Sequence, residues 1–309
     1  RGRLVMSDRM LLCVALCASM SMHASASLTF SRMPRIRIGR ACGARSQSLS
    51  KHSYNRVRVG ASVNPGQVLE SGDNVVLMGV LDPIGREILS QLQEENKYDV
   101  GTLLNSGSMS PFKSRFQSVN AVDASDVENA IELLHNASAV IMAFEKPADT
   151  GTLRYLLGHA AEGSTPLKRF ILLSRTGISR RGNFGAAFFK NLIGRDLDKY
   201  ADLEELLQKG ADALKVDFTV VRTGKLRLGP DSFNNPDLLA VAEEQLFETK
   251  FKAVELPSDD EKDGDSSRAD VSEAIVEALT RPTTANKIFS VLNAEGKEKG
   301  SWDNLFKSI

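Results

Sequence analysis

A short apolar run that leads through two glycines into an amphipathic segment, Asn74–Arg86 (NVVLMGVLDPIGR), restricts the fold of this chain more than any other stretch. Val75–Met78 has the composition of a buried strand, Gly79 and Gly85 bracket a turn, and apolar residues then recur at helical spacing. A buried strand that runs through a glycine turn into a helix is typical of the nucleotide site of a doubly wound α/β domain. There the backbone N–H groups of the turn and the helix N-terminus attract a pyrophosphate.

The residue at position 82 departs from the dinucleotide-binding pattern, which has a glycine there so that the backbone can approach the phosphates. This sequence has Asp82, followed by Pro83. Asp as N-cap and Pro as first helical residue would start the helix and satisfy its free N–H groups. The same carboxylate would repel a pyrophosphate. Both interpretations predict weakened dinucleotide binding.

The first 69 residues differ in composition from the rest, and we expect them to be a disordered targeting leader. They hold eleven of the 39 Lys and Arg residues, one of the 39 acidic residues and all three cysteines. With Met6 as the start, residues 6–26 resemble a signal peptide, and the Arg- and Ser-rich residues 27–62 resemble a transit peptide. This combination is similar to the bipartite leader of plastid proteins in algae with secondary plastids. A mitochondrial presequence and a secreted protein are the alternatives.

The remaining residues, 70–309, carry 28 basic and 38 acidic residues. An acidic body argues against binding to nucleic acid or to anionic membranes, which requires clustered Lys and Arg. Without the leader the chain has no thiol, so no cysteine metal site or cysteine nucleophile is possible. The only histidines of the body are His135, near a helix end where a cation suits the dipole, and His159, expected to be packed or solvated. We therefore assign no metal site, and we find no transmembrane segment.

Short apolar strands alternate with amphipathic helices along the rest of the chain, which predicts a doubly wound, Rossmann-like parallel sheet in a single domain over 70–309. A charge-rich segment, 230–267, is expected to be an irregular insertion with a helix at Pro236–Phe247. The segment around Lys113 and Arg115 is expected to be a solvated loop. The predicted strands are 98–104, 117–122, 138–144, 169–174, 217–222 and 287–292, and the predicted helices are 124–134, 153–161, 186–209 and 269–280.

Five motifs occur in an order that resembles the atypical short-chain dehydrogenase/reductase family, a single-domain NAD(P)-binding group related to NmrA-like regulators and to certain plastid proteins. The resemblance covers about residues 74–293. The motifs are MGVLDPIGRE, AVDASD, KRFILLSRTGIS, the pair LDKYADLEELLQ and VDFTVVRTGKL, and SSRADVSEAIVEAL.

The resemblance implies NADP(H) or NAD(H) as cofactor and assigns roles residue by residue. Gly79 and Gly85 would shape the phosphate turn, with Asp82 inside it and Arg86 at the start of its helix. Asn105 lies where the ribose would be recognised, but it is neither the acid nor the arginine that selects a cofactor. Further positions implied by the family are Asp123 beside the adenine, Ala143 and Phe144 as the floor, Ser174 as a substrate-orienting hydroxyl, and Arg222, Thr223 and Gly224 at the nicotinamide pocket.

The tyrosine and lysine that active members carry one helical turn apart are missing. Tyr54, Tyr98, Tyr155 and Tyr200 are followed at that spacing by Arg58, Thr102, His159 and Glu204. Lys199 matches a lysine that atypical members keep on this helix, so it is either a contact to the cofactor ribose or a surface lysine.

Two functions remain open at this stage. The chain is either a protein that kept the NAD(P)-binding fold without hydride transfer and acts as a plastid binding, assembly or regulatory factor with a protein partner, or an NADPH-dependent reductase or epimerase. The second would use Ser174, Thr176 and Lys199. The fold alone does not choose between them.

Overall fold

Parallel strands form the centre of a mixed sheet in this computed structural model, which describes residues 66–163, 167–179, 194–227, 252–258, 260, 262–296 and 299–309. The strand order is β3-β2-β1-β4-β5-β6-β10-β9-β7, with β8 paired to β10. The strands are β1 Asn74–Met78, β2 Asp99–Leu104, β3 Asn120–Asp123, β4 Ala139–Met142, β5 Arg169–Arg175, β6 Asp217–Thr223, β7 Lys225–Leu226, β8 Ala253–Glu255, β9 Asp265–Ser266 and β10 Lys287–Ala294. The order reverses between β1 and β4, and ligands of open α/β sheets bind outside the carboxyl ends of the strands at such a point. The predicted doubly wound α/β fold is confirmed.

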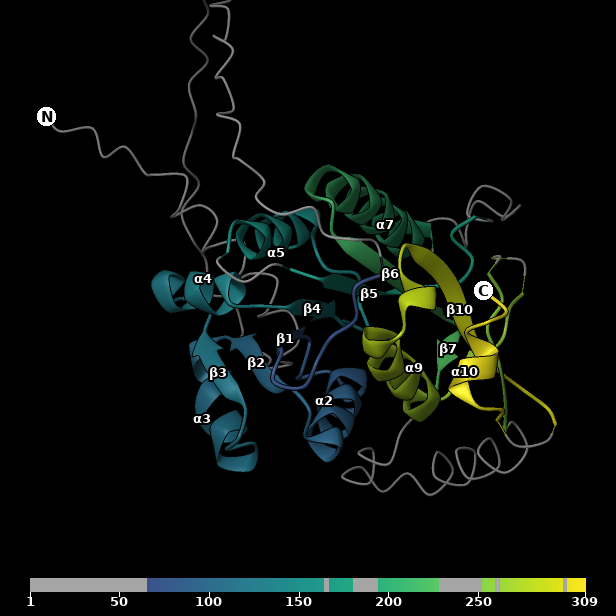
Figure 1. Cartoon of the computed structure of the whole chain (residues 1–309), viewed down its shortest axis with the longest axis horizontal. Coiled ribbons are helices and arrows are strands. Elements are labelled where there is room, and N and C mark those ends of the chain that lie inside the picture. The colour runs from purple at the N-terminus through teal and green to yellow at the C-terminus, as the bar shows by residue number, and fades with distance from the viewer. Residues whose placement is uncertain are drawn as a thin grey trace, which may run out of the picture.

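Helices cover both faces of the sheet (Figure 1). α2, α3 and α9 lie on one face, and α4, α5 and α7 lie on the other. The helices are α2 Pro83–Glu95, α3 Ser106–Arg115, α4 Val127–His135, α5 Thr150–Glu162, α7 Gly194–Leu214, α9 Arg268–Thr280 and α10 Trp302–Leu305, with a 3₁₀ turn, η2, at Pro282–Thr284.

Successive residues of β1 enter two different apolar cores. Val75 and Leu77 pack on the face of α2 and α9, whereas Val76 and Met78 pack on the face of α4, α5 and α7. Neighbouring side chains of a strand point to opposite faces, so a strand covered on both sides is apolar throughout. This requirement produced the uninterrupted apolar runs from which the strands were predicted.

Two segments differ from the sequence-based predictions. The segment that contains Lys113 and Arg115 is helix α3, not a loop, because Asn105 caps it and Phe112 is buried in the core. The segment 230–267 contains the short strands β8 and β9, which pair antiparallel with β10. Of the predicted leader 1–69, residues 1–65 lie outside the described residues, as do the predicted helix Pro236–Phe247 and residues 186–193 of another predicted helix. Leu69 is buried, and its backbone N donates to the Leu279 carbonyl oxygen at 3.2 Å. Within the described part of the chain, no helix combines the length and the apolar character needed to cross a bilayer.

Candidate functional site

The glycine turn after β1 packs so closely on its neighbours that neither glycine can carry a side chain. Gly79 has φ +93°, and a Cβ there would lie 2.3 Å from the carbonyl oxygen of Ala143 at the end of β4. A Cβ on Gly85 would lie 2.0 Å from the carbonyl oxygen of Gly79. The two glycines therefore fix the turn against β4 and α2. Ala143 is fully buried, and the Phe144 ring lies on the same side of the turn.

Asp82 is the N-cap residue of α2 and Pro83 begins the helix, but the predicted capping hydrogen bond is absent. The Asp82 carboxylate instead accepts a hydrogen bond from the backbone N of Glu145, at 3.0 Å. It is 8% exposed. The prediction that Asp82 satisfies the free N–H groups of its own helix was wrong, because the loop after β4 offers the carboxylate a donor.

Glu145 supplies the acceptor at the start of α2. Its Oε1 accepts a hydrogen bond from the backbone N of Ile84, at 3.3 Å. Arg268 holds the carboxylate with two further hydrogen bonds, from Nε at 2.8 Å and from Nη2 at 3.2 Å. Tyr200 donates from its hydroxyl to the Glu145 carbonyl oxygen at 2.9 Å. A carboxylate of the chain itself thus occupies the helix terminus where a pyrophosphate would bind.

Arg86, expected to begin the helix, is half-buried in the first turn of α2, three residues after the first helical residue, Pro83. Its backbone N donates to the Asp82 carbonyl oxygen at 3.0 Å, which continues the helix. The turn therefore combines two carboxylates, from Asp82 and Glu145, with the Arg268 guanidinium. An anion that binds at this turn would have to compete with these two carboxylates.

Asn105 and Asp123 lie side by side at the carboxyl ends of β2 and β3, where Leu104 pairs with Asp123. The Asn105 side chain caps α3 by accepting a hydrogen bond from the backbone N of Ser108 at 3.0 Å. Asp123 accepts from the backbone N and from the hydroxyl of Ser125, at 2.8 and 2.7 Å. Hydrogen bonds from Ser106 and then Ser125 hold the pKa of Asp123 below its usual value, so it is an anion at neutral pH. Their predicted roles towards ribose and adenine stay predictions.

Ser174 at the end of β5 belongs to a buried charged cluster. Its hydroxyl donates to Oε1 of Glu204 at 2.6 Å, and Glu204 is 3% exposed. Arg222 on β6 binds the same carboxylate through Nε at 3.0 Å and Nη2 at 2.6 Å. Burial lowers the pKa of Arg222, but the hydrogen bond and the charge of Glu204 outweigh burial and leave this pKa above its usual value. The Ser174 hydroxyl proton is thus used in the hydrogen bond to Glu204.

The loop after β5 is tied to the same cluster through Asp260. Arg222 Nη1 lies 3.9 Å from Asp260 Oδ2, and that carboxylate accepts hydrogen bonds from the backbone N of Gly177 and of Ser179, at 2.6 and 2.7 Å. The Thr223 hydroxyl donates to the Ser174 carbonyl oxygen at 3.3 Å. Hydrogen bonds thus bring Ser174, Arg222 and Thr223 together and join β5 to β6, while their roles towards substrate and nicotinamide stay predictions.

Lys199 and Tyr200 diverge on α7. The Lys199 side chain is 60% exposed, with its nearest carboxylate at Asp196, 3.9 Å away. Tyr200 is 4% exposed and reaches the Glu145 loop. Burial raises the pKa of the Tyr200 phenol above its usual value. The residue that α7 presents to the crevice is Tyr200, and the role of Lys199 stays a prediction.

A cavity of about 210 Å³ opens at the carboxyl ends of β4, β5 and β6. Pockets for small molecules and cofactors usually measure about 300–1,000 Å³. The cavity is therefore small for a dinucleotide but wide enough for a compact polar molecule. Its lining residues are Phe144, Glu145, Leu173, Ser174, Arg175, Tyr200, Thr223, Gly224, Lys225, Leu226 and Arg268.

Five side chains that build this site were not predicted from the sequence: Glu145, Tyr200, Glu204, Asp260 and Arg268. Glu145 carried a usable signal, since it follows the buried fourth strand by a few residues and so had to lie at the carboxyl edge of the sheet. Glu204 stands one helical turn after Tyr200 on the buried side of α7, beside Leu203, where an unpaired carboxylate would be costly. Both observations pointed to a paired buried charge.

The fold, with its crevice at the carboxyl ends of the strands, is that of a nucleotide-binding α/β domain. The chain matches the NAD(P)H-binding family over residues 83–282, more than half of its length, and it belongs to that family. The match begins one residue after Asp82, so β1 and most of the glycine turn lie outside it. A comparison with curated proteins finds no match.

Solved structures show the same fold at low sequence identity. The oxidoreductase ylbE from Lactococcus lactis is 19% identical over 76% of this chain and 96% of its own, with a TM-score of 0.54. A short-chain dehydrogenase/reductase from Veillonella parvula, solved in complex with NADP, is 14% identical over 74% and 99%, with a TM-score of 0.54. The anaerobillin reductase ChuY from Escherichia coli O157:H7 is 16% identical over 72% and 98%, with a TM-score of 0.53.

Proposed function

We propose that this protein is a member of the atypical short-chain dehydrogenase/reductase group that works as a binding or regulatory factor without hydride transfer, and that it holds its phosphate turn closed in the absence of ligand. The observation that carries the closed phosphate turn is the Glu145 carboxylate at the N-terminus of α2, held there by Arg268. A dinucleotide would have to displace Glu145 and approach Asp82. Binding is then weak unless a partner or a second ligand opens the turn.

The side chains at the carboxyl end of β5, around Ser174, support the absence of hydride transfer in this proposal. Hydride-transferring relatives need a phenol whose pKa is lowered by a neighbouring ammonium. Here burial raises the pKa of Tyr200. The residue one helical turn after it, where active relatives have a lysine, is Glu204, and the Ser174 hydroxyl donates a hydrogen bond to that carboxylate. No group among these is prepared to give a proton to a carbonyl oxygen.

The test is an NADPH titration of the full chain, followed by fluorescence. We expect Glu145→Ala to bind NADPH at least about tenfold more tightly than wild type, a gain of about 1.4 kcal/mol. The change removes the competing carboxylate and frees Arg268 for a phosphate. Glu145→Gln distinguishes the effect of the negative charge from the effect of the side chain's volume, because the amide still fills the site without a charge. Asp82→Gly combined with Glu145→Ala should add a further gain.

Glu94→Gln is the matched control, since Glu94 is an exposed acid near the other end of α2. It should leave the affinity unchanged. Micromolar binding by wild type, or equal affinity in wild type and Glu145→Ala, would show that Glu145 does not close the site.

One observation favours the second candidate, an NADPH-dependent reductase or epimerase. The cavity beside Ser174 brings Tyr200, Arg175 and Lys225 to one polar pocket. Oxidation of NADPH by wild type with any carbonyl compound, abolished in Tyr200→Phe, would support the enzyme and remove the first proposal.

The plastid of an alga with secondary plastids is the compartment that we propose, with the mitochondrion as the alternative. The support is the composition of residues 1–69 alone. A fluorescent protein fused behind residues 1–69 tests it, and retention in the cytosol would contradict it.

A further inference from the structure

The C-terminal ends of α4 and α5 meet at the amino edge of the sheet, opposite the crevice. Both helices pack into the same apolar core. The contact is tightest where α5 stops, because a Cβ on Gly163 would lie 2.1 Å from the His135 carbonyl oxygen. This close approach fixes the last turns of the two helices beside each other.

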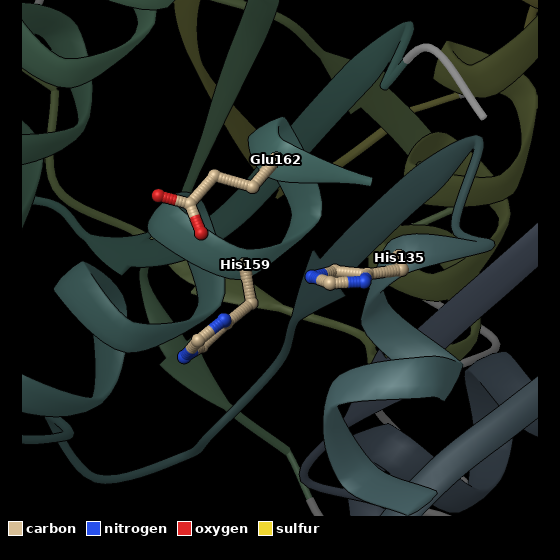
Figure 2. A group of neighbouring side chains, drawn as sticks. All are labelled: His135, His159 and Glu162. Carbon is tan, nitrogen blue, oxygen red and sulfur yellow. The ribbon is translucent and has the colours of Figure 1, made fainter. Parts of the chain in front are cut away.

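Three side chains with metal-ligating atoms are neighbours where the two helices end (Figure 2). They are His135 of α4 and His159 and Glu162 of α5, and one ligand atom of each lies within 4.8 Å of the other two. The imidazole centroids of the two histidines are 6.0 Å apart. The ring of Tyr155 stands edge-on to His159 at 4.5 Å and limits its rotation.

His135 gives an independent indication of a ligand. Its Nε2 is buried and has no hydrogen-bond partner among the described residues. A buried nitrogen without a partner costs free energy that a bound cation or water would recover. Figure 2 shows the His135 ring directed towards the space shared with His159 and Glu162.

We propose that His135, His159 and Glu162 form a site for a divalent transition-metal ion of the Zn²⁺ class, with water as the fourth ligand. Two imidazoles and a carboxylate are a ligand set that Zn²⁺ accepts, and three protein ligands leave one position open. The negative ends of two helix dipoles add attraction for a cation. This site lies outside the dinucleotide crevice and is independent of the proposed function.

Metal binding requires only side-chain movement. Ligand atoms around a tetrahedral Zn²⁺ at about 2.05 Å are about 3.3 Å apart. The distances between the ligand atoms, now up to 4.8 Å, therefore have to shorten by up to about 1.5 Å. Glu162 is exposed and can rotate to close the site, while the backbones of α4 and α5 stay in place.

The experiment is thermal unfolding of the full chain with added Zn²⁺, together with calorimetric titration. We expect Zn²⁺ at about one hundred times its Kd to raise the Tm of wild type by about 5–10 °C. Glu162→Gln, at an exposed position, removes the charge of one ligand and should weaken binding at least about tenfold. His135→Asn should weaken it at least as strongly.

The cysteines and histidines of residues 1–69 need their own control. A variant with Cys13→Ser, Cys17→Ser, Cys42→Ser, His23→Asn and His52→Asn keeps the proposed site and should keep the Tm rise. Co²⁺ adds a spectroscopic readout, since thiolate ligands give a near-ultraviolet charge-transfer band that a site of imidazole and carboxylate lacks.

Two results would overturn the proposal: no rise in Tm with Zn²⁺ in wild type, or an equal rise in wild type, Glu162→Gln and His135→Asn. A rise that persists in the leader variant and disappears in Glu162→Gln supports it.

Discussion

At the residue scale, Glu145 combines two tasks that usually belong to different groups. Its carboxylate accepts the hydrogen bond from Ile84 at the start of α2, and its backbone N satisfies Asp82. The main chain of Glu145 therefore holds the Asp82 carboxylate in place, although the charges of the two side chains repel each other. Arg268, from a distant part of the chain, supplies the compensating charge.

Gly85→Ala tests how tightly the turn is packed. The new Cβ would lie 2.0 Å from the Gly79 carbonyl oxygen, so the turn or α2 must shift. We expect a loss of about 1–3 kcal/mol in the free energy of unfolding, measured by urea denaturation. Gly158→Ala is the matched control, since a Cβ there meets nothing within 4 Å inside helix α5. It should be neutral or stabilising by up to about 1 kcal/mol. Equal effects of the two changes would contradict the close packing of the turn.

At the element scale, Asp73 connects the amino ends of three strands. It precedes β1 and accepts hydrogen bonds from Lys168 Nζ at 2.7 Å, before β5, and from the Ser138 hydroxyl at 3.0 Å, before β4. It also accepts from the backbone N of Glu70 at 2.7 Å. Burial raises the pKa of Asp73, but these hydrogen bonds, led by the one from Lys168, outweigh burial and hold the pKa below its usual value of 3.8.

The lowered pKa of Asp73 predicts a loss of stability in acid. Because the folded state binds the proton more weakly than the unfolded state, the contribution is complete above the unfolded pKa of about 3.9 and disappears as the pH falls through the lower folded pKa. Asp73→Asn should cost about 1–3 kcal/mol at pH 7. The difference from wild type should shrink between about pH 5 and pH 3, followed by urea denaturation. The exposed Asp202→Asn is the charge-matched control, and a pH-independent difference for Asp73→Asn would refute the argument.

Some helices and strands could be predicted from the sequence and others could not. Strands β1, β4, β5 and β6 were predicted because both faces of each strand are covered, which gives each a run of buried apolar residues. α3 was missed because Ser106–Arg115 contains Gly107 and Pro111 and buries only Phe112. β8 and β9 are three and two residues long, too short for any periodicity, and they form on the edge that β10 offers.

The site was predicted less completely than the fold for a related reason. Positions at strand ends, such as Ser174, Arg222 and Asp123, were assigned from the family resemblance. The partners that determine their chemistry come from elsewhere: Arg268 pairs with Glu145 across 123 residues of sequence, and Glu204 approaches Ser174 from α7. A local pattern does not encode such a contact.

At the scale of the whole molecule, the chain's one tryptophan gives a test of cooperativity. Trp302 of α10 is 5% exposed, stacks on Phe306 at 5.4 Å and donates from Nε1 to Glu273 of α9 at 2.6 Å. Its core also contains residues of β1, α2 and β10. We expect a blue-shifted native emission whose urea midpoint coincides with that of far-UV circular dichroism. An earlier fluorescence transition would mean that the C-terminal segment unfolds separately from the sheet.

The packing of α9 on α2 has a consequence for biosynthesis. Ile84, Ile88 and Leu92 of α2 share a core with Val271, Ile275 and Leu279 of α9, and β10 comes later still. A nascent chain leaves the ribosome from its N-terminus, so α2 (Pro83–Glu95) emerges long before its partner helix α9 (Arg268–Thr280) is translated. Until then the apolar face of α2 is exposed and can bind chaperones, and the domain is not complete before α9 and β10 have emerged.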